Sequence, residues 1–111
     1  MAFILKEKRT VWWPVAINMP VDGGGTQQHV CNSELEILEQ DEYDQLSEQR
    51  DDVKFCMRVV RTLGADITDE AGVPLDSSED TKRKLFKSAG YVRLGFIEAY
   101  HEMVTGIKAK N

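Results

Sequence analysis

The apolar residues of this chain change their spacing once, near residue 40, and that change constrains its fold class. Before residue 40 they recur at every second position, as on the buried face of a β-strand. After residue 40 they recur at spacings of three and four, as on an amphipathic helix. The length of 111 residues suits one domain. The sequence therefore predicts a single α+β domain, 1–111, with an N-terminal β-hairpin region (1–39), a helical region of about four helices (40–106) and a flexible tail (107–111).

The predicted hairpin consists of two alternating segments and a glycine-rich turn. Apolar residues in the first segment stand at odd positions: Val11, Trp13, Val15, Ile17, Met19 and Val21. Pro14 and Pro20 cannot donate hydrogen bonds to a neighbouring strand, so this strand should lie at a sheet edge or be interrupted there. The glycines at 23–25 accept the positive φ of a tight connection. The second strand is expected over about residues 27–38.

Two helices are predicted in the first half of the helical region. The first runs from a cap at Asp41 to about Gln49. The second runs from about Asp52 to Leu63, and Gly64 stands where helices often end. The apolar stripe of this second helix has spacings of three and four: Val53, Cys56, Met57, Val60 and Leu63.

Two further helices are predicted after a turn-rich loop over residues 65–76. Ser77 or Ser78 should cap a helix of about residues 79–87, and the last helix should cover about residues 91–105. One face of the last helix is apolar: Phe96, Ile97, Tyr100, Met103 and Val104. We expect the first two of these in the core and the tyrosine at its margin, where a hydroxyl reaches water or a partner.

The chain shows little that indicates catalysis or metal binding. The glycines at 23–25 are followed by a predicted strand and no nearby lysine, so a hairpin turn is favoured over a phosphate loop. The possible metal ligands, or Cys–His pairs, are His29, Cys31, Cys56 and His101. They form at most one closely spaced pair, which is atypical of a structural zinc site. We therefore expect no enzyme activity, no metal and no cofactor, and two free, partly buried thiols.

The loop that begins at Asp66 loosely resembles a calcium-binding loop. Such a loop requires a glycine at its sixth position and a glutamate at its twelfth. In this chain those positions are Ala71 and Ser77. The sequence therefore predicts no calcium site there.

Charge and hydropathy exclude some partners and leave others open. The net charge of −5 and the lack of a continuous basic stripe disfavour nucleic acid. No apolar run approaches the roughly 20 residues of a membrane-spanning helix. The apolar start, residues 1–5, is too short for a signal peptide and is followed at once by charged residues, so a cytosolic location is expected.

Charges alternate in blocks along the chain. Residues 32–52 hold nine acidic residues and one basic residue, a net charge of −8, whereas residues 81–97 hold five basic residues and no acidic one. Such blocks suit pairing between copies of the chain or with a partner. They equally suit solvated faces that pair within one monomer.

The adjacent tryptophans Trp12 and Trp13 point to opposite faces of the predicted strand, so at most one of them enters the core. The outward ring is a candidate contact for a partner protein, since a rigid aromatic contributes much binding energy when it is desolvated. The alternative is a ring that lies flat over its neighbours.

The order of these features resembles the tail assembly chaperones of long-tailed bacteriophages, over nearly the whole chain. The motifs that carry the resemblance are, in order, Lys6-Glu7-Lys8, Trp13-Pro14-Val15, Asp41-Glu42-Tyr43-Asp44, Asp69-Glu70-Ala71-Gly72-Val73-Pro74-Leu75, Ser77-Ser78-Glu79, Tyr91-Val92-Arg93 and Phe96-Ile97-Glu98-Ala99-Tyr100. One departure is Leu63-Gly64-Ala65, where such proteins often carry a tryptophan.

The resemblance implies a chaperone of the host cytoplasm that binds the tape-measure protein and assists assembly of the tail tube protein around it. It implies absence from the finished virion, and a homo-oligomer is expected. The candidate partner-binding residues are Trp12, Trp13, Tyr91, Phe96 and Tyr100, and each of them suits a place in the core at least as well. The alternative function is a structural virion component, such as a tail-completion or head–tail connector protein.

Overall fold

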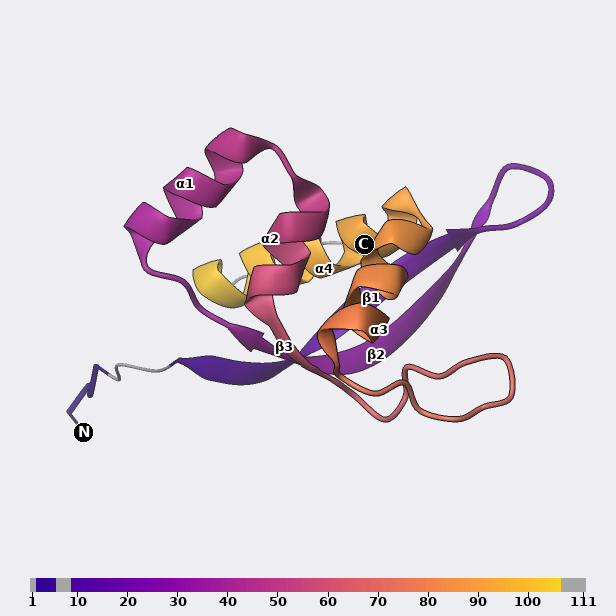
Figure 1. Cartoon of the computed structure of the whole chain (residues 1–111), viewed down its shortest axis with the longest axis horizontal. Coiled ribbons are helices and arrows are strands. Elements are labelled where there is room, and N and C mark those ends of the chain that lie inside the picture. The colour runs from indigo at the N-terminus through magenta and orange to yellow at the C-terminus, as the bar shows by residue number, and fades with distance from the viewer. Residues whose placement is uncertain (1, 6–8, 107–111) are drawn as a thin grey trace.

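The chain folds as an α+β domain in which helices cover one face of a small antiparallel sheet (Figure 1). The computed structural model describes residues 2–5 and 9–106. The elements in chain order are β1 (Thr10–Pro20), β2 (Thr26–Glu36), α1 (Gln40–Gln49), α2 (Asp52–Val59), β3 (Val60–Leu63), α3 (Glu79–Ser88) and α4 (Gly90–Thr105). The predicted fold class, a hairpin followed by about four helices, is confirmed. The predicted tail, 107–111, lies outside the described residues.

The predicted hairpin is confirmed as β1 and β2, which pair in antiparallel register from Thr10 opposite Glu36 to Pro20 opposite Thr26. Gly23 and Gly24 hold the positive φ values that the turn requires, 95° and 91°. The sheet order is β1-β2-β3, so the proline-containing strand lies at an edge as expected.

The prediction of one helix from Asp52 to Leu63 is wrong. The helix ends at Val59, and Val60–Leu63 form β3 on the open edge of β2. As a strand, these residues pair with the main chain of β2, and just after them the N–H of Gly64 donates to the Asn32 carbonyl at 2.9 Å. Gly64 is therefore not a helix terminus. It permits a close approach to the Asn32 main chain, because a Cβ at residue 64 would overlap the Asn32 carbonyl oxygen.

The helix starts agree only in part with the predicted caps. Ser78 caps α3 by accepting the Thr81 N–H at 3.2 Å. The predicted cap at Asp41 is wrong, since α1 begins at Gln40 and Asp41 lies inside its first turn. The negative charge of Asp41 there still interacts favourably with the helix dipole. The Ser77 hydroxyl instead accepts the Leu63 N–H at 2.9 Å and ties the loop to β3.

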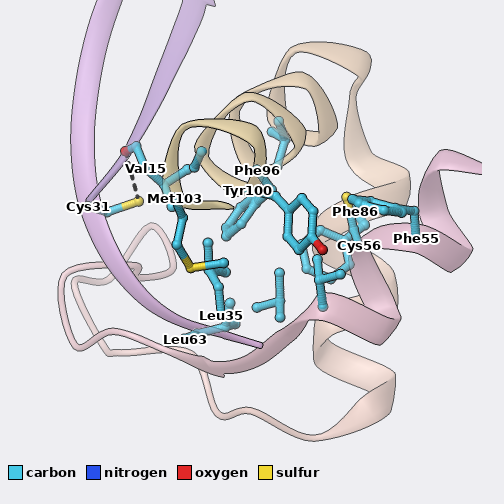
Figure 2. Packing of buried hydrophobic residues seen from close by; sticks show 14 of the residues in the cluster. Val15, Cys31, Leu35, Phe55, Cys56, Leu63, Phe86, Phe96, Tyr100 and Met103 are labelled. Atoms are coloured by element: carbon cyan, nitrogen blue, oxygen red, sulfur yellow. Dashed lines mark hydrogen bonds between the residues drawn. The ribbon is translucent and has the colours of Figure 1, made fainter. Parts of the chain in front are cut away.

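One hydrophobic core joins the inner face of the hairpin to α2, α3 and α4 (Figure 2). Its fully buried members include Val15 and Leu35 from the sheet and Phe86 and Phe96 from the helices. The rings of Phe86 and Phe96 meet edge to face with centroids 5.2 Å apart. Among the helices of the described residues, none has the length and apolar character to cross a bilayer.

Candidate partner-binding surface

Within the described part of the chain, no helix lies over the outer face of the sheet, and Trp12 stands on this face. The alternation of β1 turns Trp13, Val15 and Ile17 toward the core and leaves Trp12 with 54% of its surface exposed. Val30 lies on the same outer face and is 60% exposed. It stands opposite Ala16 in the register. The sequence predicted that the two tryptophans would point to opposite faces, and the structure assigns Trp12 to the outside.

We call this region the outer sheet face and define it by Trp12, Pro14, Ala16 and Val30. All four share the parity that faces away from the core in their strands. Polar pairs border it at both ends. The Asn18 amide oxygen accepts from the Gln28 amide nitrogen at 3.2 Å, and the Thr62 hydroxyl donates to the Glu34 carboxylate at 2.9 Å. Asn32 and Glu34 of β2 also face outward, opposite Pro14 and Trp12. Such a mixture of apolar and polar groups is typical of the contact surface between two proteins.

The open edge of β1 is poorly suited to adding a strand. The main-chain N–H of Asn32 donates to Asp66 and its C=O accepts from Gly64, so neither group points toward β1. Pro14 and Asn32 are therefore a pair without hydrogen bonds between them, and the main chain of Pro14 faces the open edge of β1. Proline has no N–H to offer there. Two residues further on, α4 approaches so closely that a Cβ on Gly95 would lie 2.8 Å from the Ala16 carbonyl oxygen. A partner would therefore contact the face of β1 rather than extend its edge.

The remaining predicted partner-binding residues are not part of this surface. Trp13 and Tyr91 are half-buried against the core, and Phe96 is completely buried. The expectation that Phe96 lies in the core is thus confirmed. The same expectation for Ile97 is wrong, because its side chain is only partly buried and packs on the margin of the core. Phe96 cannot contact a partner unless the fold opens.

The expectation that Tyr100 lies at the core margin is wrong. Its side chain is 1% exposed and stacks on Tyr43 with ring centroids 5.9 Å apart. The Leu38 N–H donates to its hydroxyl at 3.2 Å, and burial raises the pKa of the phenol. The physical reason is that α4 packs against α2 and α3 as well as over β1, and Tyr43 of α1 covers the Tyr100 ring, so the buried stripe of α4 is wider than one apolar face.

A second feature, absent from the predictions, is a hollow between α1, α2 and α4. It encloses about 240 Å³ and has an apolar floor made by Leu46, Phe55 and Ile97. Tyr43 and His101 border it, with the Tyr43 hydroxyl 2.8 Å from the His101 Nε2. The sequence patterns gave no sign of this hollow, because its walls come from three separate elements.

The two thiols are free and buried, as predicted, and they are poor nucleophiles. Burial raises the pKa of Cys31 to about 11 and that of Cys56 to about 12. Each thiol donates to a main-chain carbonyl, Cys31 to Val15 at 3.7 Å and Cys56 to Arg93 at 3.9 Å. Within residues 2–5 and 9–106, no three side chains of His, Cys, Asp or Glu are grouped to hold a metal ion.

Neither family models, nor curated proteins, nor solved structures show a match to this chain.

Proposed function

We propose that this chain is a protein-binding protein whose contact surface is the outer sheet face around Trp12. The observation that carries the proposal is an exposed tryptophan on a sheet face that none of the described helices covers, with Val30 exposed on the same face of the next strand, opposite Ala16. Large apolar groups on a bordered, uncovered face favour a contact with another protein. A binding role also agrees with thiols that burial keeps protonated.

The partner we propose is a phage tape-measure protein, with the chain acting as a tail assembly chaperone in the host cytoplasm. The support is the order of motifs from Trp13-Pro14-Val15 to the last helix, which resembles that family over nearly the whole chain. A chaperone of this kind must hold an aggregation-prone chain without joining it permanently. A sheet face suits that task, because a partner held by side chains forms none of the main-chain hydrogen bonds that fix an added strand to a sheet edge.

Co-expression with the tape-measure protein of the same phage, followed by a pull-down, tests the proposal. The parent should capture the tape-measure protein, and Trp12→Ala should lose most of the capture, because hot-spot aromatics contribute about 2 kcal/mol or more to a contact. Leu94→Ala is the matched control, since Leu94 is also 54% exposed but lies on α4. Equal capture by the parent and Trp12→Ala would remove the outer sheet face from the function.

The alternative is a structural protein kept in the virion, such as a tail-completion or head–tail connector protein. The same uncovered face would then be buried permanently in the particle. Mass spectrometry of purified virions separates the two functions. A chaperone is absent from virions, whereas a structural component is present at a fixed ratio to the other tail or connector proteins.

A further inference from the structure

Two exposed surfaces of opposite charge lie on different helices of this domain. The α1 acidic surface consists of Asp41, Asp44 and Glu48, whose spacing of three and seven residues places them on one side of the helix. The α3 basic surface consists of Arg83, Lys84 and Lys87, which also share one side. All six side chains belong to exposed residues.

These six side chains do not pair with one another inside the monomer. The ion pairs shown among the described residues are Arg9–Glu39, Arg58–Glu36, Arg58–Glu42 and Arg61–Glu36. Arg58 and Arg61 thus pair with two acidic residues of the segment 32–52, Glu36 and Glu42. The α1 acidic surface belongs to the same segment but lies outside this cluster of ion pairs. In the α1 acidic surface, the Asp44 carboxylate accepts a hydrogen bond from the side-chain amide of Gln40 at 2.9 Å.

The fold keeps the two surfaces apart. α2 lies between α1 and α3 and packs against each of them (Figure 1). The α3 basic surface continues into a hollow of about 380 Å³ between α2 and α3. Three basic residues, Lys54, Arg83 and Lys87, line this hollow together with one acidic residue, Asp51, and with Val53 and Met57. A helix with acidic side chains complements this hollow in charge, and α1 of another molecule presents such a helix.

We propose that copies of this chain associate by placing the α1 acidic surface of one molecule on the α3 basic surface of the next. The contact joins two different surfaces, so it closes as a two-fold dimer with two such contacts or continues into a ring or filament. Each exposed ion pair contributes little alone, and salt screens it within about 8–10 Å. The association should therefore be weak and sensitive to ionic strength. It leaves the outer sheet face free, so it does not depend on the proposed partner.

Sedimentation velocity with charge-reversed variants tests the contact. The parent should associate at about 50 mM salt and sediment as a monomer at about 500 mM, where the Debye length is only a few ångströms. The variants Lys84→Glu with Lys87→Glu, and Asp44→Lys with Glu48→Lys, should each be monomeric at low salt. Their equimolar mixture should associate again, because each variant then offers the complement of the other. Circular dichroism should show that both variants are folded.

The double variant Glu70→Lys with Glu98→Lys is the control for a change in net charge alone. It alters the charge as much as the α1 reversal does, at exposed positions outside α1 and α3. This control should associate as the parent does. A parent that is monomeric at low salt, or a mixture of the two reversed variants that stays monomeric, would overturn the proposal. Loss of tape-measure capture by the α3 reversal in a monomeric parent would overturn it too, and would assign that surface to the partner.

Discussion

Trp12 and Trp13 are adjacent in β1 and lie in opposite environments. Trp12 is half-exposed on the outer sheet face, whereas Trp13 packs on the core opposite Ser33. The Trp13 indole N–H and the Ser33 hydroxyl are both buried, and neither has a hydrogen-bond partner among the described residues. The Trp13 ring therefore stabilises the fold through packing rather than through its polar edge.

Substitutions at the two tryptophans should separate stability from binding. Trp13→Ala should lower the free energy of unfolding by about 3 kcal/mol, because it removes a large ring from the core margin. Trp13→Phe should cost less than about 1 kcal/mol, since it keeps most of the ring and removes an unpaired donor. Trp12→Ala should remain within about 0.5 kcal/mol of the parent, as exposed substitutions usually do. Urea denaturation measures all three. A Trp12→Ala variant as unstable as Trp13→Ala would contradict the assigned faces.

At the scale of elements, one charge cluster ties the sheet to α1 and α2. The Arg58 guanidinium on α2 donates to both oxygens of Glu42 on α1, at 2.7 and 2.9 Å, and to Glu36 at the end of β2, at 3.0 Å. Arg61 of β3 adds a second bond to Glu36 at 3.1 Å. The Arg58 hydrogen bond, the largest of several causes, lowers the pKa of Glu36 below its ordinary value of 4.5.

Removing the Glu36 charge should make the free energy of unfolding depend less on pH in the acidic range. The unfolded chain binds the Glu36 proton more readily than the folded chain does. The stabilisation is therefore present above about pH 5 and is lost as pH falls through the folded-state pKa. Glu36→Gln should cost about 1 kcal/mol at pH 7 and progressively less toward pH 3. Thermal melts across this range measure it, with Glu98→Gln on the exposed side of α4 as control. A difference from the parent that stays constant down to pH 3 would refute the linkage.

Local patterns predicted most elements but not the third strand. Alternation and glycines were enough for the hairpin, and Ser78 was enough for the start of α3, because those signals lie within a few residues of each other. The segment Val60–Leu63 continues the helical spacing of α2, so nothing local marks its change to β3. The open edge of β2 decides that change, together with Lys82, whose ammonium donates to the Val60 carbonyl at 3.0 Å. Both are distant in sequence.

The candidate site, like the fold, could be predicted from the sequence only where neighbouring residues determine it. Strand alternation showed that one tryptophan would face outward, but which one depends on where the helices pack. The burial of Tyr100 likewise depends on α1, since Tyr43 stacks on its ring from an element 57 residues away in sequence. The hollow beside Tyr43 has walls from three elements. Such features arise only when the whole chain is assembled, and single-segment patterns do not contain them.

At the scale of the molecule, the core joins the hairpin to the helical region. Cys31 of β2 and Cys56 of α2 belong to the same buried cluster, together with Leu35 and Met103 (Figure 2). A small domain with one shared core unfolds as a unit. The two cysteines therefore report on the two halves of the chain, one from the sheet and one from the helices.

Both thiols should become reactive in a single unfolding transition. In the folded chain at pH 8, pKa values of about 11 and about 12 leave few thiolates, so alkylation should be at least about a hundredfold slower than in urea-unfolded chain. Pulse alkylation at increasing urea, with each cysteine quantified by peptide mass spectrometry, should give the same midpoint for Cys31 and Cys56. That midpoint should match the one from circular dichroism. Labelling of Cys31 at lower urea than Cys56 would show that the hairpin opens first, and the outer sheet face would then belong to a separately unfolding part of the chain.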